Sequence, residues 1–190
     1  MRDPKGGAVN VHEAISDRLR DWVVAQPMFF VATAPTAPDG HINLSPKGMS
    51  GSLAVLGPMR VGYLDYTGSG AETVAHLREN GRITLMFCSF SGPPQIVRLY
   101  GKGRPVFPSE EGFAELRGAF GRDSDHAIRA IIDVTVTMVS DSCGYAVPLM
   151  DLVAERDLLN KWAARKTPEQ ITEYWATRTA TSIDGLPAIP

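Results

Sequence analysis

The stretch ITLMFCSFSGPPQIVRLYGKGRPVF, from Ile83 to Phe107, decides the fold class of this chain. Its first segment, residues 83–90, is apolar on both faces, which is typical of a central strand in a barrel or sandwich. Gly92-Pro93-Pro94 predicts a turn, and residues 95–107 predict a long second strand. Gly101 lies inside that strand, where glycine permits sharp coiling or a bulge. The stretch therefore indicates a β protein.

More strands and several helices surround this stretch. Strands are predicted over residues 28–34, 41–47, 53–56, 59–66 and 130–139. In the last of these, strict alternation places Ile132, Val134, Val136 and Met138 on one face and Asp133, Thr135 and Thr137 on a wet face. Helices are predicted over residues 12–25, 69–80, 109–120, 152–164 and 168–177. Many consecutive strands with helices at the periphery predict a mainly β fold with peripheral helices, a small β-barrel.

Length and composition set the remaining limits. The 190 residues predict one domain over 1–190, with a flexible tail over 1–10 and a helical C-terminal extension over 141–190. A net charge of −2 gives no reason to expect nucleic acid as a partner, because binding its phosphates requires a basic surface. No stretch is apolar for long enough to be a secretory signal or a membrane span, so a cytoplasmic protein without membrane contact is expected. Cys88 and Cys143 lie far apart and fit a reducing compartment.

Asn43, Ser45 and Lys47 form the first candidate for chemistry. Strand alternation places their side chains on one face, where they offer an amide, a hydroxyl and a cation. This combination suits an anion such as phosphate, because charge-assisted hydrogen bonds to phosphate oxygens are strong. A solvated strand face is the alternative reading of the same pattern.

The second candidate is the segment Asp65-Tyr66-Thr67-Gly68-Ser69-Gly70, which ends a strand and opens a helix. Helix N-termini favour phosphate because they carry unpaired N–H groups and partial positive charge. Ser69 followed by Glu72 fits a capping box, so Ser69 is the predicted N-cap. A capping serine can also be purely structural, and Glu72 would repel a phosphate if its side chain pointed there.

Arg98 is the third candidate, in a strand that also presents Tyr100, Lys102 and Arg104 on the same side. Such a run is either a basic patch or an ordinary solvent face, and Arg98 is preferred because apolar neighbours flank it. The four histidines are scattered without a metal-binding spacing, and no Gly-x-Ser-x-Gly elbow is present. The sequence therefore supports neither a metal site nor a catalytic triad, and any reactivity would come from a cofactor.

The order of these segments resembles that of the pyridoxamine 5′-phosphate oxidase-like family, the FMN-binding split β-barrel. The resemblance rests on Ser45-Pro46-Lys47-Gly48, on Tyr66-Thr67-Gly68-Ser69 before a short helix, and on the two strands of the opening stretch, and it covers roughly residues 12–140. It extends to a subgroup of oxidase-like proteins that share residues 141–145 and the Ser-Ile-Asp-Gly-Leu-Pro tail. The resemblance implies a homodimer with FMN at the subunit interface. It also implies that Lys47 and Ser69 hold the phosphate and that Asn43, Ser45, Asp65, Tyr66, Thr67 and Arg98 lie near the cofactor.

The chain also departs from that family. Gly70 and Ala71 stand where basic residues follow the capping serine, and the basic residue that begins the second strand is missing. Arg98, or a basic residue from elsewhere, would then have to complete the phosphate site. The Arg-x-His element of true pyridoxamine phosphate oxidases is absent near the end of the chain, so oxidation of vitamin B6 is not expected.

Two classes of function remain open. The first is an FMN-dependent oxidoreductase, in which a reduced nicotinamide or a small organic substrate passes a hydride to the flavin; its catalytic residues are unknown. The second is a non-catalytic flavin-binding, stress or sensor module. The same fold with deazaflavin or haem in place of FMN is a further variant.

Overall fold

The computed structural model describes residues 9–122 and 126–190. Within these ranges the strands are β1 (Asn10–His12), β2 (Met28–Thr33), β3 (Asn43–Gly48), β4 (Leu53–Gly57), β5 (Arg60–Tyr66), β6 (Arg82–Cys88), β7 (Ile96–Val106) and β8 (Ile128–Ser142). The helices are α1 (Asp17–Val24), α2 (Glu72–Glu79), α3 (Phe113–Arg117), α4 (Leu158–Ala163) and α5 (Pro168–Arg178). Across the described residues, no helix is both long and apolar enough to span a membrane.

The strands form one curled antiparallel sheet in the order β3-β2-β6-β7-β8-β5-β4, and β1 pairs with β8. The prediction of a mainly β split barrel with peripheral helices is confirmed. The two ends of the sheet are β3 and β4, which do not pair with each other in the described ranges. β4 pairs with β5 only between Arg60 and Tyr63, so the last residues of β5 extend beyond it. This open seam is the split of the barrel.

Two apolar clusters hold the sheet together. The larger one fills the inside of the curl and includes Val31, Tyr63, Leu85 and Leu99. The smaller one, which includes Leu64 and Phe120, lies on the other side of β5 and β8. Alternate residues of β5 therefore belong to different clusters, as the twofold period of a strand requires.

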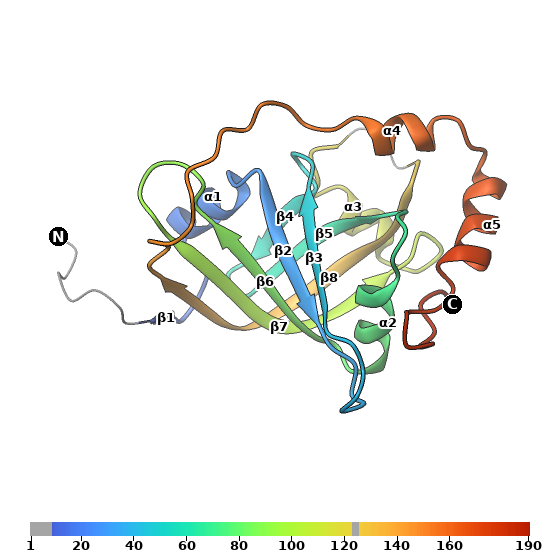
Figure 1. Cartoon of the computed structure of the whole chain (residues 1–190), viewed down its shortest axis with the longest axis horizontal. Coiled ribbons are helices and arrows are strands. Elements are labelled where there is room, and N and C mark those ends of the chain that lie inside the picture. The colour runs from blue at the N-terminus through green and yellow to red at the C-terminus, as the bar shows by residue number, and fades with distance from the viewer. Residues whose placement is uncertain (1–8, 123–125) are drawn as a thin grey trace.

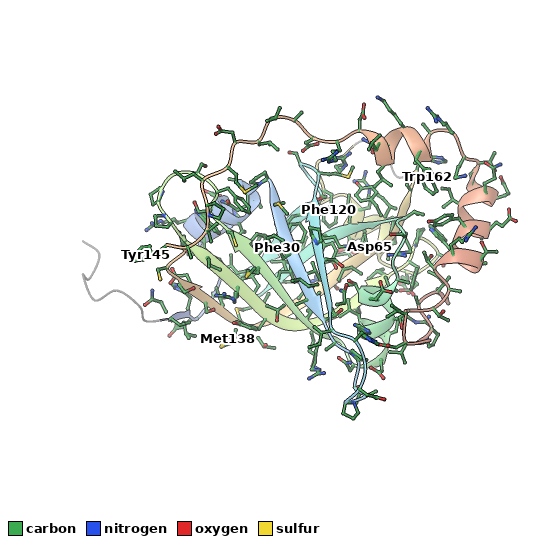
Figure 2. The ribbon with its side chains drawn as sticks, viewed as in Figure 1. Phe30, Asp65, Phe120, Met138, Tyr145 and Trp162 are labelled. Carbon is green, nitrogen blue, oxygen red and sulfur yellow. The ribbon has the colours of Figure 1, made fainter. Side chains whose placement is uncertain are left out.

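The helices and the C-terminal chain surround the barrel unevenly. Helix α2 closes one end, and the segment after β8 runs along the top of the molecule to α4 and α5 (Figure 1). Among the described elements, none lies in front of β2, β3 and β6 in that view, and Phe30 is on this uncovered face (Figure 2). The sheet thus has a core-facing side and a side without a helical cover.

The alternation predicted for β8 is wrong at Met138. The register between β7 and β8 shifts between Tyr100 and Gly101, so β8 carries one extra residue there. After the shift Val139 is fully buried, while Met138 is 40% exposed. The bulge depends on Gly101, because a Cβ at this position would collide with the carbonyl of Thr135.

Several predicted helix boundaries also need correction. The chain from Asn10 to His12 is a strand, so the first helix begins later, at Ser16, whose hydroxyl accepts from the N–H of Leu19. The rest of the predicted tail, residues 1–8, lies outside the described residues. Helix α3 is shorter than predicted because Gly112, not Ser109, begins it. Only the last turns of the predicted helix over 152–164 form, as α4.

Candidate functional site

A cluster of three charged side chains spans the split of the barrel. The ammonium of Lys47 on β3 lies 3.2 Å from Oδ1 of Asp65 on β5. The guanidinium of Arg129 on β8 holds the other oxygen, Oδ2, with Nε at 2.8 Å and Nη2 at 2.7 Å. Asp65 is completely buried inside the curled sheet, where Figure 2 labels it, and the Arg129 side chain is 3% exposed, whereas that of Lys47 is 25% exposed. Lys47 is therefore the solvent-facing member of the cluster.

A β-bulge delivers Arg129 to this cluster. Asp65 pairs with Ala130, and the next residue, Tyr66, pairs with Ile128, so Arg129 has no partner in the ladder. A bulge bends a strand and re-aims a side chain, and bulges are frequent beside active sites. Here the bulge turns an arginine inward onto a buried carboxylate.

The charges of the cluster do not cancel. Burial raises the pKa of Asp65, but the opposing attraction of Arg129 and Lys47 outweighs it, and the pKa lies below its ordinary value. With Asp65 ionised, two cations face one anion, which leaves one positive charge in excess. Because Arg129 is buried, Lys47 is the member that can present this excess to a ligand.

Asn43 and Ser45 point to the same face as Lys47, as predicted, but their hydrogen bonds are already assigned. The Asn43 amide donates to the hydroxyls of Thr33 and Thr73 at 3.1 and 3.0 Å. The Ser45 hydroxyl donates to Oδ1 of Asn43 at 2.7 Å. Their donors are therefore spent inside the protein, and Ser45 retains only acceptor lone pairs.

The Thr33 hydroxyl continues this network to a buried histidine. Its oxygen lies 3.0 Å from Nδ1 of His76 on α2. Burial lowers the pKa of His76, which favours the neutral ring. The network links the polar face of β3 to α2.

The start of α2 differs from the prediction. Ala71, not Ser69, is the N-cap, and no side chain caps the helix, so the proposed capping box is wrong. Ser69 lies two residues earlier, in the exposed segment Gly68–Gly70. The carboxylate of Glu72 folds back over Gly70 and accepts from the N–H of Ile183 at 3.3 Å. Negative charge at this position makes the helix start itself a poor anion site.

Thr67, Tyr66 and Arg98 are not gathered around Lys47. The Thr67 hydroxyl is buried, donates to the carbonyl of Ala127 at 3.0 Å and accepts from the Trp175 indole of α5 at 2.8 Å. Tyr66 packs against the smaller cluster and lines a cavity of about 460 Å³ on that side of β5. Arg98 pairs across the sheet with Met86 on the outer face, and its guanidinium donates to Ser142 at 3.2 Å. Of the predicted residues, the structure brings together Lys47, Asp65, Asn43 and Ser45.

Arg129 is the residue that the sequence argument missed. The predicted strand began at Ala130, and a register shift between two strands leaves no mark in the alternation of one strand. A signal was nevertheless present, because Arg129 is a single charge inside the apolar run Ile128 to Ile132. A charge in such a run needs a partner when it is buried. Among the described residues, no group of three metal-ligating side chains accompanies the cluster.

The comparisons with known proteins agree with this architecture. A family model described as pyridoxamine 5′-phosphate oxidase matches residues 15–143. The pyridoxamine 5′-phosphate oxidase family protein ustO of Aspergillus flavus is 41% identical over 192 residues, which cover 94% of this chain and 77% of that protein. A solved structure of a HupZ variant from Group A Streptococcus has a TM-score of 0.51 at 18% identity, covering 67% of this chain and 98% of that one. The FAD binding protein from Mycobacterium smegmatis has a TM-score of 0.49 at 16% identity, covering 70% and 95%. The family model and the relative from Aspergillus together establish that the chain belongs to the pyridoxamine 5′-phosphate oxidase family.

Proposed function

We propose that this protein is a homodimeric flavin-dependent oxidoreductase that binds FMN and acts on a small organic molecule. The observation that carries the proposal is the excess positive charge of the Lys47, Asp65 and Arg129 cluster, presented at the split of the barrel by a partly exposed ammonium. Membership of the family and the resemblance to its FMN-binding proteins support the identity of the cofactor.

The residues at the split fit a phosphate group in charge and in donors. An ammonium has three N–H donors, and the structure gives one of those of Lys47 to Asp65. Within the described residues the other two have no acceptor, so they remain for an oxyanion. Gly68 and Ser69, which precede the residue that the Glu72 carboxylate covers, add exposed backbone that a ligand can approach closely. A bound flavin would supply the redox chemistry that side chains lack, while the protein supplies binding and orientation.

The uncovered face of the sheet supports the proposed dimer. Cross-strand pairing places Pro46, Phe30, Met86 and Arg98 in one row on this face. A neighbouring row ends at Met138, and Leu44 on the edge strand is 63% exposed. Apolar surface of this kind is the usual material of a subunit interface. Light scattering at micromolar concentration should give the mass of a dimer, and a monomer would contradict an interface site.

The cofactor is tested by an absorption spectrum of the purified protein before and after addition of FMN and desalting. We expect flavin bands to be retained at about one per subunit, as a specific site requires. Loss of all flavin on desalting would contradict FMN binding. A different retained chromophore would identify deazaflavin or haem as the occupant instead.

A non-catalytic flavin-binding module is the second candidate. The Glu72 carboxylate at the start of α2 favours it, because this charge weakens the phosphate site that the family resemblance implies. Anaerobic mixing of the FMN-loaded protein with reduced nicotinamides separates the two candidates. Bleaching of the flavin followed by catalytic turnover supports the oxidoreductase, whereas an unreactive flavin supports the binding module.

A further inference from the structure

One guanidinium connects the two segments to which the family resemblance assigns the phosphate. Arg129 holds Asp65, which in turn holds Lys47 on β3. Its remaining nitrogen, Nη1, donates to the carbonyl of Gly70 at 2.9 Å. Gly70 directly follows Ser69 in the exposed segment before α2. The lysine and the glycine-rich segment are thus connected through two buried side chains, Asp65 and Arg129.

The two carboxylate oxygens of Asp65 have different partners, and this division determines how much of the Lys47 ammonium remains for a ligand. Arg129 occupies Oδ2 with two nitrogens, so Lys47 is left with Oδ1 and a single, longer contact of 3.2 Å. A carboxylate without the arginine could accept from the ammonium with both oxygens and neutralise it. Arg129 therefore supplies the excess charge and also prevents Asp65 from capturing Lys47 completely.

We propose that Arg129 is the positioning residue of an anion site formed by Lys47 and the Gly68–Gly70 segment, and that this site selects flavins that carry a phosphate. The inference rests on the proposed function and deepens it by naming the source of the missing positive charge. The basic residues absent at Gly70 and Ala71 are replaced by an arginine that reaches the same segment from β8. It acts from beneath the segment because it is 98% buried, and not as a direct ligand.

The test compares two ligands that differ only in the phosphate. Dissociation constants for FMN and riboflavin are measured by quenching of flavin fluorescence in the wild type, Arg129→Met, Arg129→Lys and the double variant Asp65→Asn/Arg129→Met. The wild type should prefer FMN, and Arg129→Met should lower FMN affinity by roughly 10- to 100-fold while riboflavin affinity changes less than about twofold. Arg129→Lys keeps the charge but has no fork to hold both Asp65 and Gly70, so its preference should be intermediate.

The double variant separates positioning from charge. It removes one buried cation and one buried anion, so the excess charge stays the same while Lys47 loses its carboxylate. Loss of the FMN preference in a folded double variant supports positioning, and retention of the wild-type preference overturns it. Because both buried charges are removed together, this variant also decides the matter if Arg129→Met fails to fold. Arg60→Met is the matched control, because Arg60 on β5 pairs with Asp133 on β8 away from the split. This variant should keep the wild-type preference for FMN.

A second probe distinguishes failure of this inference from failure of the proposed function. Inorganic phosphate is added to the flavin-free protein, and the thermal midpoint is compared with a chloride control of equal ionic strength. A wild type that binds neither flavin overturns the proposed function, but a rise of its midpoint with phosphate that the double variant lacks would still support the anion site. A wild type that binds both flavins equally well, or that gains nothing from phosphate, overturns the inference.

Discussion

Two arginine–aspartate pairs join the same two strands, β5 and β8. They differ in the exposure of the arginine and in the strand that carries it. Arg60 on β5 binds Asp133 on β8 through Nε and Nη2, at 2.9 and 3.0 Å. The Arg60 side chain is 48% exposed. At the other end of β5 the residue types are exchanged, because Asp65 lies on β5 and Arg129 on β8, and both are buried.

The difference shows what each pair contributes. In the Arg60 pair only the cation is half exposed, since the Asp133 side chain is 10% exposed. Water already solvates that guanidinium and salt screens its attraction, so such a pair gains little. A buried pair loses so much hydration that well-packed apolar residues often give equal or greater stability. Stability of the fold alone therefore does not account for a charged cluster at the split of the barrel, and the proposed anion site would give the cluster a role.

The largest expected effect is on stability when the buried pair is broken. Arg129→Met leaves Asp65 buried with only the longer contact to Lys47, so we expect the free energy of unfolding to fall by about 3–5 kcal/mol. Urea denaturation monitored by tryptophan fluorescence measures it. The double variant Asp65→Asn/Arg129→Met should recover most of this loss. A single variant as stable as the wild type would mean that water reaches Asp65.

The next largest effect concerns FMN binding and tests Lys47, the partly exposed member of the cluster with Asp65 and Arg129. Lys47→Ala removes a charged hydrogen-bond donor, so we expect FMN binding to weaken by about 1–3 kcal/mol. A fluorescence titration measures the change. Lys102→Ala is the matched control, because Lys102 is a surface lysine that donates to the carbonyl of Asn80 at 2.9 Å. An unchanged FMN titration for Lys47→Ala would remove this lysine from the site.

Breaking the exposed pair should have a much smaller effect. Arg60→Met should change the free energy of unfolding by about 0–1 kcal/mol, since the guanidinium is half exposed and Asp133 keeps a second arginine, Arg104, at 3.7 Å. The same urea experiment applies, and added salt should reduce the difference further. A loss as large as that of Arg129→Met would show that exposure does not separate the two pairs.

The sequence was sufficient to predict the barrel and the β3 side of the candidate site. The alternation of residues 41–47 placed Asn43, Ser45 and Lys47 on one face, because the period of a strand depends on local geometry alone. It could not show that the Asn43 amide donates to Thr33 and Thr73, since these partners come from other segments. The Ser45 hydroxyl in turn donates to Oδ1 of Asn43. Arg129 escaped detection for a related reason, because its direction follows from a register shift between two strands.

The smallest expected effect concerns an ion pair at the surface between a histidine and an aspartate. Nδ1 of His41, in the loop between β2 and β3, lies 2.6 Å from Oδ1 of Asp184 in the C-terminal tail. The hydrogen bond and charge of Asp184 raise the pKa of His41, so the protonated ring is favoured in the folded state. The charge contribution to this contact is therefore complete below the ordinary histidine pKa of about 6.5 and is lost as the pH rises through the higher folded value. The backbone N–H of His41 still donates to Oδ2 of Asp184 at 2.8 Å.

Hydrogen exchange corrected for its intrinsic pH dependence measures this loss. We expect the protection of the Gly185 amide, which donates to the carbonyl of Ser182 within the tail, to fall as the pH rises from about 6 to above the raised pKa of His41. In His41→Gln the protection should be independent of pH over the same range, because the amide cannot titrate. Equal pH dependence in the two proteins would mean that the tail is held by its other contacts, such as that of Arg78 with the carbonyl of Ile189. The tail would then resemble the Arg60 pair, in which a visible ion pair contributes little, and the buried cluster around Arg129 would stand apart from both.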